Sequence, residues 1–232
     1  MHIPDGYLGP ITYGLLWIVM IPIWIIAASK VKKTLKTKQV PLLAIGAAFS
    51  FVIMMFNVPI PGGSTGHAVG GTLIAVVLGP WAALIAISIA LVIQALFFGD
   101  GGITAIGANC FNMGVVLPFV GYYVYRLIST NSEVTSSRRW IGAGIGSYIA
   151  LNAAAIFTAI EFGIQPYLHH TASGQALYSP YPLSVAVPAM AFEHIVFFGF
   201  VELIVTAFVV KYIQQTDTTL LEHKVAYGVS AA

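Results

Sequence analysis

Long apolar segments, separated by short polar ones, fill most of this 232-residue chain and constrain its fold more than any other feature. Hydrophobic residues make up 58% of the chain and charged residues only 8%, whereas soluble globular proteins carry about 25% charged residues. A helix needs about 20 mostly apolar residues to cross a bilayer, and only helices and closed barrels satisfy their backbone polar groups there. The chain is therefore predicted to be an all-α, polytopic integral membrane protein.

About seven membrane helices are predicted, separated by Gly- and Pro-rich or polar turns. Their ranges are 11–29, 41–56, 67–78, 81–98, 103–125, 140–160 and 183–212. The segment 67–78 is the shortest, and its rise of about 18 Å cannot cross a core of about 30 Å. We expect this segment to pack inside the bundle, shielded from lipid.

Basic residues predict the orientation of the chain. In this topology all ten Lys and Arg residues lie on one side of the membrane, mainly after the first span and between residues 126 and 139. The positive-inside rule places that side in the cytoplasm, so the amino terminus is expected outside and the carboxyl terminus in the cytoplasm. Residues 1–232 are predicted to form one membrane domain, with an outer segment at 1–10 and a cytoplasmic tail at 213–232.

Two features exclude other kinds of partner and site. The net charge of +2 is not gathered into a basic stripe, so no nucleic acid is expected to bind. Cys110 is the only cysteine, which excludes an intrachain disulfide and any CxxC metal site. A single cysteine in an apolar segment is typical of a small packing residue.

The first two residues form a potential chelating group. The free amine of Met1, the amide nitrogen of His2 and the His2 imidazole can close fused five- and six-membered rings around one metal ion. Planar nitrogen coordination suits nickel(II) and copper(II), whereas zinc prefers a tetrahedron. His67 is the candidate fourth donor, because the glycines before it permit close approach of the backbone. We expect it to begin a helix on the same outer side.

Each of these residues also has a simpler explanation. His2 can be an incidental terminal residue, and His67 can be a hydrogen-bonded helix cap. Found together, on the outer side and without competing cysteine ligands, they indicate a metal site. An amine and two imidazoles must lose protons to bind a metal, so uptake is expected to weaken in acid.

Two motifs in this chain closely resemble those of the CbiM/NikM family. Met-His-Ile-Pro-Asp-Gly-Tyr-Leu at residues 1–8 is similar to the family's start, and Gly-Ser-Thr-Gly-His-Ala-Val-Gly-Gly at residues 63–71 is similar to its second motif. The resemblance extends through the last span. It implies a seven-helix capture component of an energy-coupling-factor transporter for cobalt or nickel. It also implies that the terminus dips into a central pocket, where Met1, His2 and His67 bind the ion.

The resemblance further implies the partners of the chain. These are a transmembrane coupling (T) subunit and two ATP-binding ATPase subunits, with or without a small accessory membrane subunit, in the lipid of a prokaryotic cell (inner) membrane. The chain has no GxxxxGK[ST] phosphate loop, so ATP hydrolysis is expected in the partners and the chain is not expected to be an enzyme. Nickel(II) is the favoured substrate. The alternative is a cobalt(II) importer subunit that supplies cobalamin synthesis.

Polar residues beside the two motifs are candidates for supporting roles. Asp5 is expected to orient a metal-bound imidazole, as outer carboxylates often do, or to begin a turn with Gly6. Asn57 and Ser64 are expected to hydrogen-bond around the site, although turn formation alone explains both.

Ionisable residues in or near spans are functional candidates by default, because burying them in lipid is costly. They are Glu161, Glu193, His194 and Glu202. His194 is the alternative fourth ligand, although no glycine loop positions it. The outer-loop pair His169 and His170 is expected to be solvated.

Small residues four apart lie on one helix face and let a neighbouring helix approach closely. Ala44 with Ala48 and Gly142 with Gly146 form two such pairs. In the related transporters such a face docks on the coupling subunit, so Ala44 and Ala48 are the candidate docking residues. Packing within the chain is the alternative for both pairs.

Two rival functions come from other classes. A membrane metalloenzyme, such as an intramembrane protease, would want a motif such as HExxH, and Glu193-His194 lacks the second histidine. A transporter or sensor for an organic solute, with His67 as a gate, would bind no metal.

Overall fold

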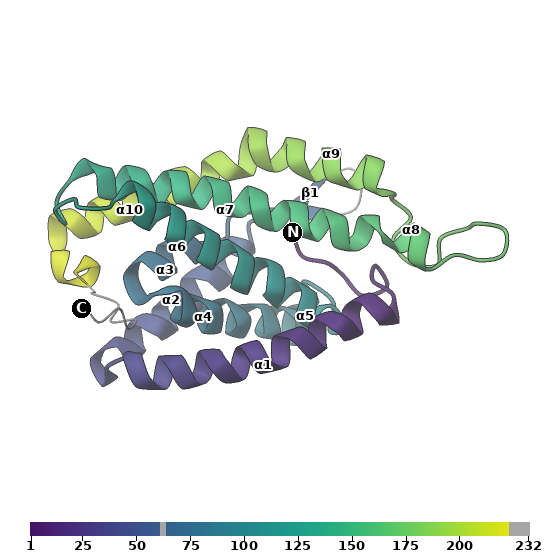
Figure 1. Ribbon diagram of the computed structural model, residues 1–232, viewed down its shortest axis with the longest axis horizontal. Coiled ribbons are helices and arrows are strands. Elements are labelled where there is room, and N and C mark those ends of the chain that lie inside the picture. The colour runs from purple at the N-terminus through teal and green to yellow at the C-terminus, as the bar shows by residue number, and fades with distance from the viewer. Residues whose placement is uncertain (61–63, 223–232) are drawn as a thin grey trace, which may run out of the picture.

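The computed structural model describes residues 1–60 and 64–222, apart from the side chains of Lys38, Ile60 and Ser64. It is a bundle of helices with one small hairpin (Figure 1). The α-helices are α1 (Pro10–Thr34), α2 (Val40–Met54), α3 (Gly71–Leu78), α4 (Pro80–Ile93), α5 (Ile106–Asn109), α6 (Leu117–Ile128), α7 (Ser137–Gly163), α8 (Gln165–Leu168), α9 (Leu183–Glu193) and α10 (Gly199–Thr216). The strands β1 (Val58–Ile60) and β2 (Ser64–Gly66) pair antiparallel.

Several of these helices join through tighter or wider turns. π-helical segments at Gln94–Phe98, Cys110–Val116 and His194–Phe198 follow α4, α5 and α9, and short 3₁₀ turns occupy Thr37–Gln39 and Thr218–Leu221. Within residues 1–60 and 64–222, five helices, each counted with any short helical segment that continues it, are long and apolar enough to cross a membrane. They are Pro10–Thr34, Pro80–Phe98, Ile106–Ile128, Ser137–Leu168 and Leu183–Thr216. The prediction of a mostly helical, multi-span membrane protein is confirmed. The number of crossings and the side of each terminus stay predictions.

Prolines and glycines set several helix boundaries. Pro10, Pro41 and Pro80 lie in the first turns of α1, α2 and α4, where the missing N–H costs no helical hydrogen bond. Gly79 has a φ of +87°, a conformation that glycine adopts freely, and it turns the chain from α3 into α4.

The helix expected to begin at His67 begins instead at Gly71. Gly70 has a φ of +75°, which no helix interior contains, and the carboxylate of Glu202 accepts hydrogen bonds from the backbone of residues 69 and 70. These contacts hold residues 67–70 out of the helix. α3 itself is short and its residues 71–76 are buried, as expected for a segment shielded from lipid.

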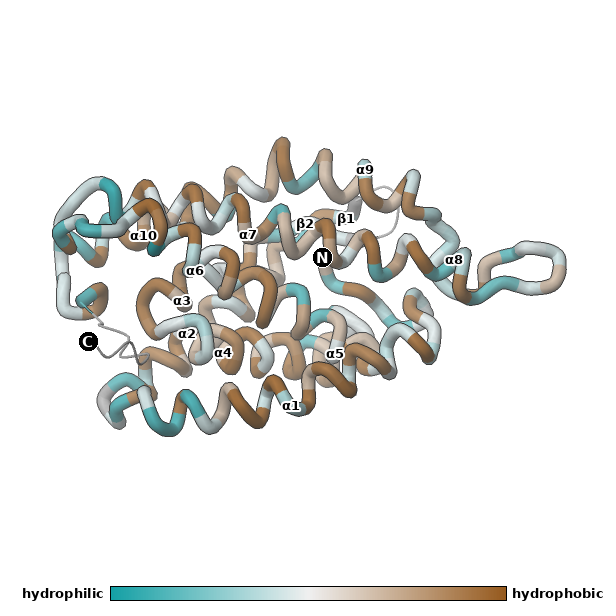
Figure 2. The backbone as a smooth tube through the Cα atoms, viewed as in Figure 1, coloured by the Kyte–Doolittle hydropathy of each residue, from teal (hydrophilic) through white to brown (hydrophobic). Residues whose placement is uncertain are grey.

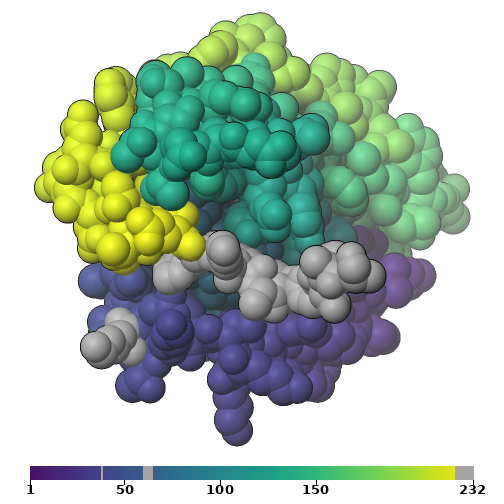
Figure 3. Space-filling view, turned by 60° about the vertical axis from the view of Figure 1, so that its left-hand side comes forward, coloured from purple at the N-terminus to yellow at the C-terminus, as the bar shows by residue number. Residues whose placement is uncertain are grey.

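Two helices organise the packing. α7 packs against α6, α9 and α10, whereas α4 packs against α1, α2 and α3. In Figure 1 α1 accordingly runs along one side of the bundle, and α9 and α10 run along the other. The space-filling view shows the same division, with the purple amino-terminal part below and the teal, green and yellow parts above (Figure 3).

Large apolar side chains cover the outer surface of the helices. On α1, Ile11, Leu15, Ile18 and Ile25 are 59% to 70% exposed. Figure 2 shows hydrophobic residues along the helices and polar residues gathered toward the ends of the bundle. Soluble monomers rarely expose such contiguous apolar surface, so lipid is the expected solvent. The basic segments after α1 and between α6 and α7 lie at the same end, as the predicted topology requires.

Candidate metal site

The amino-terminal segment, residues 1–9, enters the bundle ahead of α1. Met1 and Ile3 expose none of their surface, and His2 exposes 4%. The amino terminus lies in the middle of the bundle, between α1 and α5 on one side and α7 and α9 on the other (Figure 1). The terminus therefore dips toward the centre, as the family resemblance implies.

Two amide side chains hold the segment at its beginning and end. Asn109 pairs with the backbone of Ile3, because its Oδ1 accepts the Ile3 N–H at 2.9 Å and its Nδ2 donates to the Ile3 carbonyl at 3.1 Å. Gln165 accepts the N–H of Gly9 through Oε1 at 2.9 Å, just before α1 begins. Both amides project from the helical core, so the path of the segment is set by packed helices.

Asp5 holds the middle of the segment. Its carboxylate accepts hydrogen bonds from the N–H of Ile103 at 3.0 Å, the N–H of Thr104 at 2.9 Å and the Thr104 hydroxyl at 2.5 Å. Partial burial acts to raise the pKa of Asp5, but the hydrogen bonds from Thr104 and Ile103 prevail and lower it. A Cβ on Gly102 would lie 2.4 Å from the Asp5 nitrogen, so only glycine lets the two loops approach this closely.

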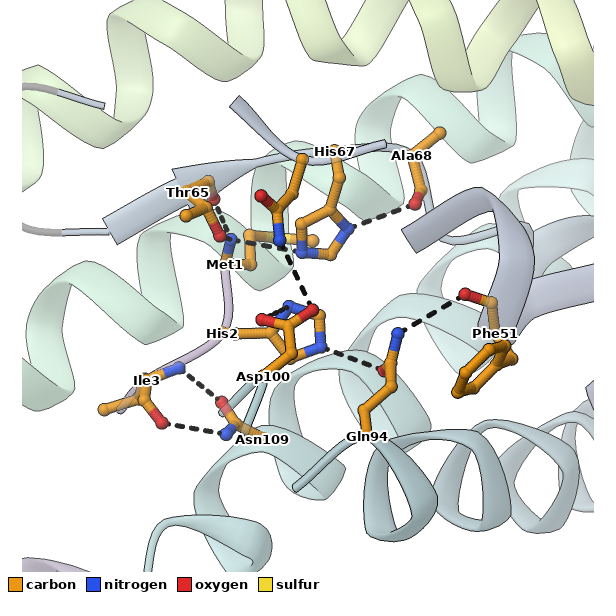
Figure 4. Close-up of polar contacts among 11 residues, drawn as sticks. Met1, His2, Ile3, Phe51, Thr65, His67, Ala68, Gln94, Asp100 and Asn109 are labelled. Carbon is orange, nitrogen blue, oxygen red and sulfur yellow. Dashed lines mark hydrogen bonds and ion pairs between the residues drawn. The ribbon is translucent and has the colours of Figure 1, made fainter. Parts of the chain in front are cut away.

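The amino group of Met1 lies against β2 and His67 (Figure 4). It donates to the carbonyl of Thr65, lies 3.4 Å from the Thr65 hydroxyl, and is 3.3 Å from Nε2 of His67. The amine is therefore enclosed by groups that can accept a hydrogen bond or share a metal ion.

The imidazole of His2 is held between two polar side chains. Its Nε2 lies 3.1 Å from Oε1 of Gln94, and its Nδ1 lies 3.6 Å from a carboxylate oxygen of Asp100. Because an amide oxygen can only accept, the proton of neutral His2 is on Nε2, and Nδ1 carries the lone pair. Nδ1 is the nitrogen that a six-membered chelate ring with the His2 amide requires.

His67 is oriented by its own loop. Its Nδ1 lies 3.1 Å from the carbonyl of Ala68, which can only accept, so Nδ1 carries the proton and Nε2 carries the lone pair. The rings of His2 and His67 are tilted by 34°, with centroids 4.6 Å apart. Both histidines thus present a ligating nitrogen while the other nitrogen is hydrogen-bonded, as is usual for metal-bound histidines.

Burial keeps these bases neutral. It lowers the pKa of the Met1 amine from 8.0 to about 4, an effect that Asp100 partly opposes. It also lowers the pKa of His2 from 6.5 to about 3, with the amine adding to the shift and the Gln94 hydrogen bond opposing it. Burial, followed by the amine and His2, likewise lowers the pKa of His67. At neutral pH all three nitrogens are available without first losing a proton.

The spacing of the Met1 amine and His67 suits two ligands of one metal ion. Two nitrogens at right angles and about 2.0 Å from one ion lie about 2.8 Å apart. The Met1 amine and Nε2 of His67 are 3.3 Å apart, so a small movement brings both onto one ion. Among residues 1–60 and 64–222, no three His, Cys, Asp or Glu side chains gather as a ligand cluster. A metal site here therefore needs the main-chain nitrogens of the terminus.

The supporting residues predicted from sequence take different positions. Asp5 bonds to Ile103 and Thr104 and not to an imidazole. It lies in a turn with Gly6, which was the alternative expectation. Asn57 donates to Asp100 at 3.3 Å, so it reaches His2 only through that carboxylate. The backbone of Ser64 lies in β2, but its side chain is outside the part that the structure describes.

Sequence reasoning missed the residues that contact the terminus directly, which are Thr65, Gln94, Asp100 and Asn109. Gln94 and Asn109 carried a usable signal, because uncharged polar side chains inside apolar spans tend to hydrogen-bond within the bundle.

The ionisable residues in the spans serve separate contacts. Glu161 accepts a hydrogen bond from Asn112 at 2.7 Å, and Glu202 binds the loop after His67. Glu193 is only partly buried. His194 is fully buried with its Nδ1 2.8 Å from the Met190 carbonyl. The imidazole in contact with the Met1 amine is that of His67, which supports His67 as the fourth donor.

The remaining sequence candidates take other positions in the bundle. Ala44 and Ala48 are exposed on α2. Gly146 lies against α6, where an added Cβ would be 2.7 Å from the Gly121 carbonyl, so this glycine serves packing within the chain. His170 is exposed, as expected. His169 is instead half-buried against Tyr178 and Gly9, so the expectation that it is solvated was wrong.

Known proteins are similar to nearly the whole chain. The model of the CbiM family, described as the cobalt uptake substrate-specific transmembrane region, matches residues 2–220. The fused nickel transport protein NikMN of Rhodobacter capsulatus is 55% identical over 221 residues, which are 95% of this chain and 64% of that protein. A putative metal transport protein of Methanocaldococcus jannaschii is 53% identical over 226 residues, which are 97% of this chain and 96% of that protein.

A solved structure has the same fold. The crystal structure of a truncated transition metal transporter superimposes with a TM-score of 0.89 at 54% identity, covering 93% of this chain and 99% of that one. This chain thus spans about two thirds of the fused relative, but nearly all of the archaeal relative and of the solved transporter. Because the family model covers residues 2–220 and these relatives share more than half of their aligned residues with it, the chain belongs to the CbiM family.

Proposed function

We propose that this chain is the substrate-binding membrane subunit of an ATP-driven energy-coupling-factor importer for nickel(II), with cobalt(II) as the alternative substrate. The observation that carries the proposal is the buried Met1 amine, 3.3 Å from Nε2 of His67, with the His2 ring 4.6 Å from the His67 ring. The ligands are the Met1 amine, the His2 amide and Nδ1, and Nε2 of His67.

The donor chemistry favours nickel over cobalt. Four nitrogens in one plane match nickel(II), and the buried Cys110 is hydrogen-bonded with Ser88 rather than offered as a soft ligand. Two fused nickel transport proteins are 55% and 48% identical to the chain, whereas a cobalt transport protein CbiM of Acetohalobium arabaticum is 35% identical over 69% of it. Cobalt remains the alternative because the family model is described by cobalt uptake.

Transport by this subunit requires partners. The sequence contains no phosphate-binding loop, so two ATPase subunits are expected to hydrolyse ATP and a transmembrane coupling subunit to transmit their movement. A small accessory membrane subunit fits the additional length of the fused relative, of which this chain matches 64%. The complex is expected in the inner membrane of a prokaryotic cell, with the site loaded from outside.

A nickel and cobalt titration of the purified chain with an untagged amino terminus tests this function. Nickel should bind with the yellow absorption of a planar site, and His2→Ala and His67→Ala should each abolish that band. His194→Ala is the comparison variant. His194 is equally buried and near enough to act electrostatically on His67, but its Nδ1 is hydrogen-bonded to the Met190 carbonyl. This variant should bind as the parent does.

The alternatives give distinct results. Loss of binding in His194→Ala with binding retained in His67→Ala would move the fourth ligand to His194. No binding of either metal by the parent chain would contradict the proposed function and favour an organic-solute transporter.

A further inference from the structure

Glu202 is a buried carboxylate on α10 that hydrogen-bonds to the loop following His67. It exposes none of its surface. Its Oε2 accepts the N–H of Val69 at 2.7 Å, and its Oε1 accepts the N–H of Gly70 at 2.9 Å. A longer contact of 3.1 Å joins the Gly70 N–H to Oε2 as well. The Glu202 side chain on α10 thus binds two consecutive peptide groups of the loop that follows His67.

The Val69 N–H belongs to the same peptide group as the Ala68 carbonyl. That carbonyl lies 3.1 Å from Nδ1 of His67 and is the acceptor that keeps the proton on this nitrogen. Glu202 therefore grips the N–H side of a rigid, planar peptide whose C=O side orients the His67 ring. The chain of contacts runs from carboxylate to peptide to imidazole.

The helical segment Leu183–Thr216, which carries Glu202, also contacts the backbone on the other side of His67. A Cβ on Gly66 would lie 1.8 Å from the ring of Phe198, so that ring packs directly against the backbone just before His67. Phe198 ends the π-helical segment that leads into α10, one turn before Glu202. Ser147 on α7 in turn lies within 3.2 Å of the Glu202 carbonyl, which ties this turn to the centre of the bundle.

Burying a carboxylate at this position costs free energy. Ionisable groups at membrane depth are expensive to bury, and a well-packed apolar residue often replaces a buried charge without loss of stability. Residues 67–70 are not helical, however, so their N–H groups have no helical acceptor. Buried backbone donors need a partner, and Glu202 supplies one for two of them.

From this arrangement we propose that Glu202 is the positioning residue for the metal ligand His67. It fixes the 68–69 peptide, and through the Ala68 carbonyl it directs the lone pair of His67 Nε2 toward the Met1 amine. This role rests on the proposed function, since it presupposes that His67 binds the ion.

The test is a nickel titration of full-length Glu202→Gln with an untagged amino terminus. Glutamine keeps the size of the side chain but sets an NH₂ group against a backbone N–H, so the peptide loses one acceptor. Affinity should fall about 10- to 100-fold, as for other outer partners of metal-bound histidine. The visible planar-nickel band should weaken, because a misdirected imidazole no longer completes the plane.

Glu161→Gln is the matched control. Glu161 is a buried glutamate on the neighbouring α7, but its carboxylate is bonded to Asn112 and not to the loop after His67. This variant should keep the parental affinity and band. Should Glu202→Gln not fold, Glu202→Asp takes its place, since it keeps the charge but withdraws the carboxylate by one methylene group.

The outcomes separate the two claims. A parental band in the Glu202 variant, or the same loss of affinity in Glu161→Gln, would overturn the positioning role and leave the metal site intact. Absence of nickel binding by the parent chain would contradict the proposed function itself.

Discussion

The amino nitrogen of Met1 lies 3.3 Å from Nε2 of His67, although 66 residues separate them in the chain. Asn109 and Asp5 bring the first partner there, and Glu202 holds the loop of the second. A site made in this way depends on the chemistry of the chain terminus and on its path.

Adding Gly-Ser before Met1 should abolish nickel binding. The extension converts the amine into an amide and needs space beside a residue with no exposed surface. The loss should exceed the roughly 100-fold typical of a lost outer partner, because a ligand itself is removed. A titration of the extended chain measures this, with the same dipeptide added at the carboxyl terminus as control. Unchanged affinity in the amino-terminal variant would exclude the amine as a ligand.

Gln94→Leu should weaken nickel binding about 10- to 100-fold, because His2 loses the acceptor that keeps its Nδ1 free of the proton. Gln94→Glu preserves an acceptor for Nε2 and should bind at least as tightly as the parent. The affinities of the two variants are compared by titration at one pH. Equal weakening by both substitutions would show that Gln94 serves packing only.

Nickel binding should release about one proton per ion between pH 5.5 and 8, and that proton comes from the His2 amide. The buried amine and His2 have pKa values of about 4 and about 3, so neither holds a proton to lose in that range. A free terminus would release protons from both groups as well. Calorimetry in buffers of different ionisation enthalpy counts the protons, and two or more would mean that the terminus is undocked before metal binds.

The same shifts predict how docking responds to pH. Because both folded-state pKa values are lower than those of the exposed groups, docking is at full strength above pH 8.0 and weakens as the pH falls toward about 4. Acylation of the terminal amine, quenched at each pH and corrected for the reactivity of a model peptide, reports the exposed fraction. This fraction should rise on acidification in the absence of metal.

The candidate histidine ligands could be predicted from local patterns, whereas the contacts that hold them could not. His2 follows the free amine and His67 follows a glycine-rich loop, so local sequence made both candidates, and the family resemblance implied the same pair. Gln94 contacts His2, 92 positions away in sequence, and Asn109 contacts Ile3, 106 positions away. Only the packing of the helices brings these pairs together. Asp5 was assigned to the imidazole because it is near in sequence, but the approach of the 102–104 loop gave it closer donors.

The helices, too, could be predicted where local sequence determines them but not where a distant residue does. Hydrophobic runs placed the long helices to within a few residues, since each run must itself satisfy the bilayer. The predicted start of α3 at His67 was wrong, because Glu202 binds the backbone of Val69, 133 positions away, and holds that loop outside the helix. The hydrophobic pattern of residues 67–78 cannot predict that contact, because Glu202 lies far away in sequence.

Asp5→Ala should lower nickel affinity about tenfold, because the loop contact that holds the middle of the segment is lost while every ligand remains. Asp217→Ala is a closely matched control. Asp217 accepts the N–H of Thr219 at 3.1 Å and its hydroxyl at 2.5 Å, the same pair of donors that Thr104 offers Asp5, but at the end of α10. A titration in which both variants bind like the parent would show that the terminus docks without Asp5.

Replacement of Ala44 or Ala48 by tryptophan should block assembly with the coupling subunit while leaving nickel binding intact. Both alanines are exposed on α2 and separated by one helical turn, so a large side chain at either position keeps a partner helix at a distance. Ala28→Trp, at an exposed alanine on α1, is the matched control and should assemble normally. Co-purification with the coupling subunit and nickel uptake by cells are the two measurements. If Ala44→Trp and Ala48→Trp assemble and transport as Ala28→Trp does, the docking face lies elsewhere on the bundle.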